Sequence, residues 1–307
     1  MGRLLFLLII SSILISCSMG TVLQEFKRFP DYPSASSVEY VNGRFYIMGD
    51  DASCLLVLDS NLNEVDTIRF FNSNERRMPK SSKHDLEAMT VLRNNKLLIT
   101  GSGSHLANRS GAIIFDPENK TFDSVRLDDF FQRFASHEID HVNIEGMALL
   151  PSAMLMANRG HMNDRHNELI VTSPDFFLNP GEAYINKMLF GVSDDSNSFQ
   201  GVSGLAYSRK KDILIATVST EKVGNSYDDG EIGKSYLWLV NNMAVKMQWK
   251  AMNPDKIIDL EKIAPAFKNQ KIEGVCVWKE TKEFLYLLLV ADNDDGGSNV
   301  FKVAVKL

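Results

Sequence analysis

A pattern of about fifty residues recurs five times along this chain. Each copy opens with a small or acidic pair, enters an apolar strand, turns, and continues into a second apolar strand with a polar end. The copies begin at Ser36, Glu87, Glu145, Ser203 and Glu273, so that successive starting points lie 51, 58, 58 and 70 residues apart. A period of this length indicates one supersecondary unit repeated in a row, and such a unit buries its apolar surface only against its neighbours.

Further strand-like segments complete the first two copies. Residues 54–59 of the first copy correspond to residues 111–116 of the second, and each segment closes with an aspartate that begins a polar turn. Residues 64–70 and 121–127 then alternate apolar and polar side chains, which is typical of a half-exposed strand. Each unit therefore contains about four strands. Helical periodicity is scarce, and the clearest helix candidates, residues 127–134 and 255–266, are short and lie between units.

Four-stranded units in series predict an all-β fold, a β-propeller whose blades pack radially. Buried inner strands explain the apolar run 284–290, which shows no polar alternation. The last unit ends with residues 299–306 as its third strand, so we expect residues 22–28 to supply the fourth strand and close the ring. Five blades are expected. Six blades are the alternative, because the long stretch after Ser203 has room for more strands, and a pair of β-sandwich domains is the competing architecture.

The composition agrees with one large folded domain. Of 307 residues 44% are hydrophobic and 23% are charged, a balance that excludes a disordered chain or a small disulfide scaffold. The formal net charge of −6 argues against a broad electrostatic grip on nucleic acid. We expect residues 17–307 to form a single propeller domain.

The first sixteen residues have the features of a signal peptide. Arg3 precedes the apolar run 4–14, which is too short to span a bilayer as a helix. The run leads into Leu14-Ile15-Ser16-Cys17, which resembles a bacterial lipobox and makes Cys17 the expected site of lipidation; an ordinary signal peptide with an incidental cysteine is the alternative. Acyl chains on Cys17 would hold the domain to a membrane. Ser18 rather than an aspartate follows, which for such lipoproteins implies the outer membrane, facing the periplasm.

Only two other cysteines are present, Cys54 and Cys276, so the chain carries no disulfide framework and no cysteine spacing typical of a metal site. We expect two buried free thiols, with a disulfide in an oxidising compartment as the alternative.

The phrases that open three of the units carry a resemblance to a known family. Residues 85–89 (DLEAM), 143–147 (NIEGM) and 271–275 (KIEGV) resemble a strand-opening phrase of phytase-like (esterase-like) propellers and of the related SdiA-regulated periplasmic propellers. The resemblance is nearest to a lipoprotein subgroup common in Bacteroidota. It implies a propeller, an extracytoplasmic location and a bound divalent cation, and it does not imply catalysis. Two units depart from the pattern, because Ser36 and Ser203 stand where glutamate is expected.

Equivalent residues of a propeller converge on its axial channel. The repeat therefore predicts that Glu87, Glu145 and Glu273 lie close together, where three carboxylates repel one another unless a cation, water or protonation compensates. Oxygen ligands favour a hard cation, so Ca²⁺ is the expected cofactor. The alternative is that each glutamate accepts hydrogen bonds from a neighbouring blade and fixes how the blades align.

A second set of polar residues stands at the ends of the second strands, where loops on a rigid scaffold usually carry function. The candidates for binding a ligand are Asp50, Asn158, Arg159, Asp292 and Asn293. The arginine can engage a carboxylate or a phosphate with two hydrogen bonds, or pair with a nearby acid instead. All six histidines fall between residues 84 and 166, close to these segments.

Three classes of function remain open from the sequence. The first is an extracytoplasmic, lipid-anchored propeller that binds a small molecule or an envelope protein at its axial mouth, with a divalent cation in the channel. The second is a metal-assisted hydrolase of phosphate or carboxylic esters, in which the glutamates hold the cation and Arg159 stabilises developing charge. The third is an envelope component whose polar residues serve packing alone.

Overall fold

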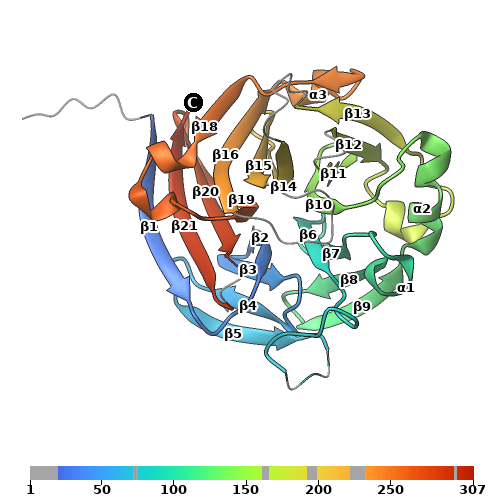
Figure 1. Cartoon of the computed structure of the whole chain (residues 1–307), viewed down its shortest axis with the longest axis horizontal. Helices are drawn as coiled ribbons and strands as arrows, with labels where there is room; N and C mark the ends of the chain where they lie inside the picture. Colours follow the sequence, from blue (N-terminus) through green and yellow to red (C-terminus); the bar gives the residue numbers. More distant parts are fainter. Residues whose placement is uncertain are drawn as a thin grey trace, which may run out of the picture.

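The computed structural model describes residues 20–71, 73, 75–160, 166–191, 199–221, 232–293 and 296–307. It confirms an all-β propeller with five blades around a central axis (Figure 1). The signal peptide predicted for residues 1–16 and the lipidation predicted at Cys17 lie outside the described residues. None of the described helices is both long and apolar enough to cross a membrane.

The blades follow one another along the chain, and each begins with its innermost strand. Blade 1 consists of β2 (Ala35–Val41), β3 (Arg44–Gly49), β4 (Cys54–Leu58) and β5 (Glu64–Arg69). Blade 2 consists of β6 (Leu86–Val91), β7 (Leu97–Gly101), β8 (Gly111–Asp116) and β9 (Thr121–Arg126). Blade 3 consists of β10 (Ile144–Leu149), β11 (Met154–Asn158), β12 (Asn167–Thr172), β13 (Asn186–Phe190) and an additional parallel strand, β17 (Ala251–Met252).

Blade 4 consists of β14 (Gln200–Ser208), β15 (Ile213–Glu221), β16 (Ile232–Asn241) and β18 (Lys256–Asp259). Blade 5 consists of β19 (Ile272–Glu280), β20 (Phe284–Asp292), β21 (Ser298–Lys306) and β1 (Thr21–Phe29). The short helices lie in the connections: α1 (Leu106–Arg109), α2 (Asp128–Gln132), η1 (Phe134–His137), η2 (Phe176–Leu178), α3 (Met243–Lys246), η3 (Leu260–Lys262) and η4 (Pro265–Phe267).

The N-terminal strand closes the ring as the sequence predicts. β1 pairs with β21 in antiparallel register, from Thr21 opposite Val305 to Phe29 opposite Ser298. One blade is therefore built from both ends of the chain, and the pairing covers the edge that β21 would otherwise expose.

The hydrophobic core lies between the blades. Each of four apolar clusters joins residues of neighbouring blades, as where Leu155 of blade 3 packs in one cluster with Leu214 of blade 4. Second strands such as β7 and β11 are buried throughout, whereas the outer strand β5 alternates exposed and half-buried residues. This gradient explains why the inner strands read as continuous apolar runs and the outer strands alternate.

The region after blade 4 differs from the sequence-based expectation. A helix was predicted over residues 255–266, but residues 256–259 form β18, which pairs with β16. Ile257 and Ile258 are β-branched and suit the outer strand that blade 4 requires. The first helix candidate, 127–134, is confirmed in a shorter form as α2. The long spacing after Ser203 is taken up by the nine- and ten-residue strands of blade 4 and by α3, not by a sixth blade.

The antiparallel order gives the propeller two distinct faces. Every first strand starts at one face, here called the mouth, and ends at the other, here called the base. β20 ends at the mouth with Asp292, whereas β1 begins at the base, where Lys306 N donates to Gly20 O at 3.0 Å. β1 spans roughly 27 Å between the two faces at about 3.4 Å per residue.

Candidate functional site

A β-bulge occurs at the same place in the first strand of all five blades. In each blade the register with the second strand skips one residue next to the mouth. The skipped residues are Ser36, Glu87, Glu145, Ser203 and Glu273, the five starting points of the sequence repeat. A bulge leaves its extra residue out of the ladder and redirects the side chain. These five residues are called the bulge ring below.

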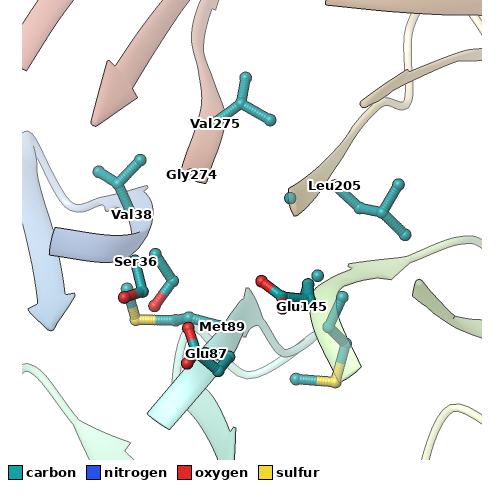
Figure 2. Close-up of a pocket in the computed structure, with 12 residues that line it drawn as sticks. Ser36, Val38, Glu87, Met89, Glu145, Leu205, Gly274 and Val275 are labelled. Carbon is teal, nitrogen blue, oxygen red and sulfur yellow. The ribbon is translucent and has the colours of Figure 1, made fainter. Parts of the chain in front are cut away.

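The bulge ring borders a small cavity on the axis. The inner strands contact one another in the order β2, β6, β10, β14, β19 and back to β2. The cavity among them is small, with a volume of about 10 Å³ that is roughly room for one water molecule, and it is lined by Ser36, Ser37, Glu87 and Glu145 together with apolar and glycine residues. Figure 2 shows the carboxylates of Glu87 and Glu145 directed into this common space. The sequence prediction that these two glutamates converge is therefore confirmed.

Glycines allow the strands to meet this closely. A Cβ on Gly146 would stand 2.6 Å from the backbone nitrogen of Leu205, and one on Gly204 would stand 2.5 Å from the carbonyl oxygen of Glu273. Both distances are far below van der Waals contact. The glycine that follows the bulge residue in blades 3 and 4 is thus required by the packing of one blade on the next, whereas blade 2 has Ala88 at this position and blade 1 has Ser37.

The acids around the cavity shift the ionisation of Glu87. Desolvation raises its pKa well above 4.5, and the nearby charges of Glu145, Asp50, Asp85 and Glu273 raise it further. Glu273 does not line the cavity, but it is close enough for its charge to contribute. These surroundings therefore favour the protonated form of Glu87 over the charged form.

The other two ring glutamates have donors two residues before them. Asn143 Nδ2 donates to Glu145 Oε1 at 2.7 Å, and Lys271 Nζ lies 2.9 Å from Glu273 Oε1. At the same position blade 2 has an acid, Asp85. Glu87 consequently differs from the others in its electrostatic surroundings.

The residues at the ends of the second strands hold these donors in place. Asn158 Oδ1 accepts the N–H of Asn143 at 2.7 Å, and Asn293 Oδ1 accepts the N–H of Lys271 at 3.1 Å. Asn158 also donates to Glu168 Oε2 at 3.0 Å. The sequence predicted that Asn158 and Asn293 bind a ligand. In the structure both lie beside the bulge ring, where they hold Asn143 and Lys271, the residues that contact Glu145 and Glu273.

Arg159 is buried at the boundary between blades 3 and 4. Its Nη2 donates to Ser219 Oγ at 3.2 Å, and its guanidinium lies against Gly201, where a Cβ would stand 2.6 Å from Nε. The side chain is thus part of the contact between two blades on the mouth side. Asp292 is also buried, at the mouth end of β20.

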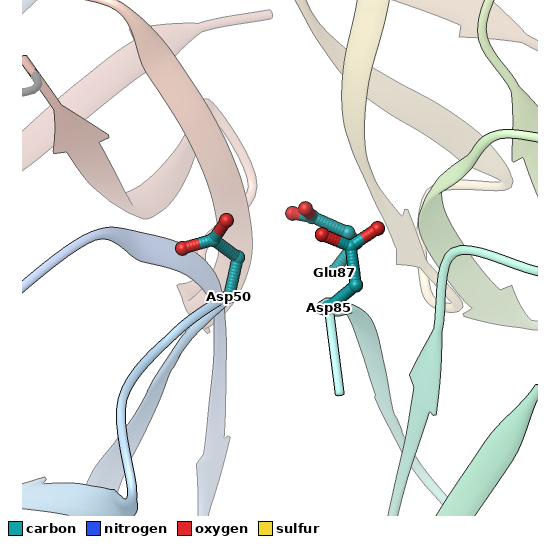
Figure 3. Close-up of side chains that lie close together, drawn as sticks. All are labelled: Asp50, Asp85 and Glu87. Carbon is teal, nitrogen blue, oxygen red and sulfur yellow. The ribbon is translucent and has the colours of Figure 1, made fainter. Parts of the chain in front are cut away.

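Asp50 belongs to an acidic cluster that the sequence did not single out. One carboxylate oxygen from each of Asp50, Asp85 and Glu87 lies within 4.8 Å of the others, a spacing that suits a metal ion (Figure 3). The ammonium of Lys83 already pairs with Asp50, and it lies 2.7 Å from Asp85 Oδ1. Arg109 Nη1 adds a further contact to Asp85 at 3.0 Å.

The donor set of this region fits a hard cation only in part. Carboxylate oxygens are suitable ligands, and Asp50 Oδ1 and Asp51 Oδ1 are buried acceptors to which no group in the described part of the chain donates. A cation shared by Asp50 and Asp85 would, however, compete with Lys83. A cation in the space between Glu87 and Glu145 would not require Lys83 to leave its ion pairs. The assignment of Glu87, Glu145 and Glu273 as metal ligands remains a prediction.

The basic segment before blade 2 is the part of the site that sequence reasoning missed. Arg77 Nε pairs with Asp51 Oδ2 at 2.6 Å, and Lys83 bridges two blades as described. The signal was available, since residues 76–83 hold four basic residues in an acidic chain. Both remaining cysteines are free: Cys276 is buried and Cys54 half-buried.

The fold and the bulge ring define a five-bladed propeller with a polar axial mouth. The chain belongs to DUF6929, a family of unknown function, whose model matches residues 31–305. No curated protein matches the sequence.

Several solved structures have a similar fold. Glutaminyl cyclase from Myxococcus xanthus matches with a TM-score of 0.55 and 9% identity, over 94% of this chain and 97% of that one. The allergen Mala s 1 from Malassezia sympodialis matches with a TM-score of 0.48 and 12% identity, over 92% and 96% of the two chains. Virginiamycin B lyase from Staphylococcus aureus matches with a TM-score of 0.44 and 10% identity, over 93% and 99%. At these identities the likeness to the cyclase concerns the fold alone.

Proposed function

We propose that the protein is an extracytoplasmic binding module, anchored through lipid on Cys17 at the outer membrane, that holds a divalent cation and a ligand at its axial mouth. The ligand is a small molecule or a segment of an envelope protein. The resemblance of the strand-opening phrases to phytase-like and SdiA-regulated propellers supports the location and the cation, which we take to be Ca²⁺.

The observation that carries the proposal is the pair of carboxylates aimed into one cavity. Bulges direct Glu87 and Glu145 to the same space, although this raises the pKa of Glu87. Bringing like charges together weakens a fold unless something compensates. A divalent cation would remove that cost, because it interacts favourably with both carboxylates.

The mouth would bind its ligand through groups of both signs. Lys83, Arg77 and Lys271 lie there beside aspartates and glutamates, and each pairs with an acid. A ligand that carries a carboxylate or a phosphate could bridge the cation and one of these bases, as paired charges commonly do in binding sites.

The cation is tested by calcium titration with two readouts. Ca²⁺ at millimolar concentration should raise the melting temperature, and a chelator should reverse the change, because a ligand that binds the folded state stabilises it. Binding should also release protons, since a protonated Glu87 must ionise to act as a ligand. Calorimetry in two buffers of different ionisation enthalpy measures that release.

The variant Glu145→Gln should lose both the rise in melting temperature and the release of protons. Glu118→Gln, in the exposed turn between β8 and β9 of blade 2, should keep them. A protein that melts at the same temperature with calcium and with chelator would contradict the cation. If Glu145→Gln binds calcium as the natural protein does, the cation is held elsewhere and this assignment of the site is wrong.

A further inference from the structure

Large apolar side chains are exposed at the base of blades 4 and 5. Val245 is 63% exposed, Ile257 55%, Trp249 50% and Leu307 44%. An exposed apolar residue by itself is ordinary, but several on one side of a molecule mark a surface that meets another phase or partner.

Hydrogen bonds place these residues on the same face. The helix α3, which carries Val245, is joined to the base turn of blade 4 by the bond from Ala244 N to Asp212 Oδ1 at 3.0 Å. Lys256 Nζ, next to Ile257, donates to Lys306 O at 2.9 Å and so links the base ends of the two blades. These exposed residues, together with the basic residues named next, are called the base patch.

The base patch is positively charged although the chain is acidic. Five basic residues are exposed in the turns and strand ends of this sector: Arg209, Lys210, Lys256, Lys282 and Lys306. The exposed acids of the same segments are Asp255 and Glu283, and Asp255 pairs with Lys246 at 2.7 Å. The whole chain has a net charge of −6, so the positive charge of this sector differs from the balance of the chain as a whole.

The N-terminal segment joins the fold at the same face. Lys306 N donates to Gly20 O, and β1 begins at the next residue, beside the C-terminus. Cys17 lies four residues before Thr21, so an extended chain places it within about 14 Å of the start of β1. The apolar run 4–14 precedes it.

We propose that the base patch lies on a lipid bilayer that carries anionic headgroups, and that the axial mouth consequently faces away from the membrane. Tryptophan and aliphatic side chains with lysines around them match the boundary between acyl chains and headgroups. Basic residues near a membrane are attracted by anionic lipids. A second copy of the chain suits the patch less well, because two patches of the same sign repel. The proposal does not depend on the cation at the mouth.

The test uses a chain that begins at Ser18, which keeps every described strand and helix. It is mixed with vesicles of phosphatidylcholine and phosphatidylglycerol in equal parts, and with vesicles of phosphatidylcholine alone. We expect flotation with the anionic vesicles and much less with the neutral ones.

Tryptophan fluorescence locates the contact. Trp238 is buried and Trp278 is half-buried among aromatic rings, so Trp249 is the exposed one of the three tryptophans. Its emission should move to shorter wavelength when anionic vesicles are added, and Trp249→Phe should float normally without that shift. If the protein floats but its emission does not move, the membrane contacts another surface and the proposal is wrong.

Charge reversal supplies a matched comparison. Changing Arg209, Lys210 and Lys282 together to glutamate should weaken binding to anionic vesicles by about tenfold or more. The control reverses three lysines on the mouth side, Lys80, Lys262 and Lys268, which changes the net charge equally and should leave binding nearly unchanged. Equal losses in both variants would show that binding follows net charge and not this patch. A concentration-dependent dimer in sedimentation, dissociated by Trp249→Ser, would overturn the proposal in favour of a self-interface.

Discussion

Glu39 shows how neighbouring blades are joined. It lies on β2, and its carboxylate accepts the backbone N–H of Tyr40 at 3.4 Å and the N–H of Val91 in blade 2. Thr90 has the equivalent position in blade 2, and its Oγ1 accepts the N–H of Leu149 in blade 3 at 3.2 Å. The same structural link is thus made by a hydroxyl in one blade and by an ionisable group in the other.

The link through Glu39 makes stability depend on pH. Desolvation raises the pKa of Glu39 from 4.5 to about 8. Because the folded pKa lies above the unfolded one, the folded state binds more protons between these two values, and stability falls as pH rises. Integrating 1.36 kcal/mol per pH unit from about pH 5 to about pH 7 gives a loss of about 2.5 kcal/mol. Solvent reaches part of the side chain, which makes this figure an upper value.

The variant Glu39→Gln isolates this contribution, because it keeps an acceptor oxygen and removes the ionisation. Urea unfolding is measured for both proteins at the two pH values. Relative to the natural protein, the variant should gain up to about 2.5 kcal/mol in unfolding free energy on going to the higher pH. Glu87 contributes a pH dependence of the same sign, but it is present in both proteins and cancels in the difference.

The matched control is Glu118→Gln, where the carboxylate is exposed and the pH dependence should equal that of the natural protein. If the unfolding free energy of Glu39→Gln changes with pH as that of the natural protein does, ionisation of Glu39 does not destabilise the folded state. Burial would then not raise the pKa of Glu39.

Three other expectations concern packing, charge and location. Gly204→Ala should destabilise the fold by about 2 kcal/mol or more, because its Cβ would overlap the backbone of the next blade, whereas Gly111→Ala has open space and should be nearly neutral; thermal unfolding of the two separates them. Lys83→Met should cost about 3 kcal/mol because it leaves the largely buried Asp50 without its ammonium partner, although Asp85 keeps Arg109, and millimolar calcium should restore part of that loss; no loss in urea unfolding would contradict the ion pair. Cys17→Ala in the full chain should move the protein from the membrane to the soluble fraction when cells are fractionated at high salt, which screens the lysines of the base patch, and unchanged retention there would argue against lipid on that residue.

The architecture was predictable because packing imposes a repeated pattern. Blades that bury their faces against one another require apolar inner strands at regular spacing, so the positions of Glu87, Glu145 and Glu273 identified the repeat. The strand at 22–28 was predictable for the same reason, because a last blade with three strands leaves an open edge. The helix predicted over residues 255–266 is wrong for residues 256–259, which form β18. The local sequence does not show that blade 4 needs an outer strand there.

The site was predictable only in outline. Periodicity places equivalent residues at the axis, but it does not show that a bulge turns Glu87 out of the ladder, since bulges depend on pairing between strands. Contacts between loops are still harder to infer. Lys83 lies in an irregular segment, and the basic run 76–83 indicates a segment that pairs with acids but does not show that Lys83 bridges Asp50 and Asp85.

We propose that the bulge ring directs carboxylates to a cation on the propeller axis. A crystal structure determined with millimolar Ca²⁺ tests this proposal most directly. The expected result is a calcium ion at about 2.3–2.6 Å from oxygens of Glu87 and Glu145. A structure in which those two carboxylates contact only water or protein donors, with calcium present in the crystal, would contradict the claim.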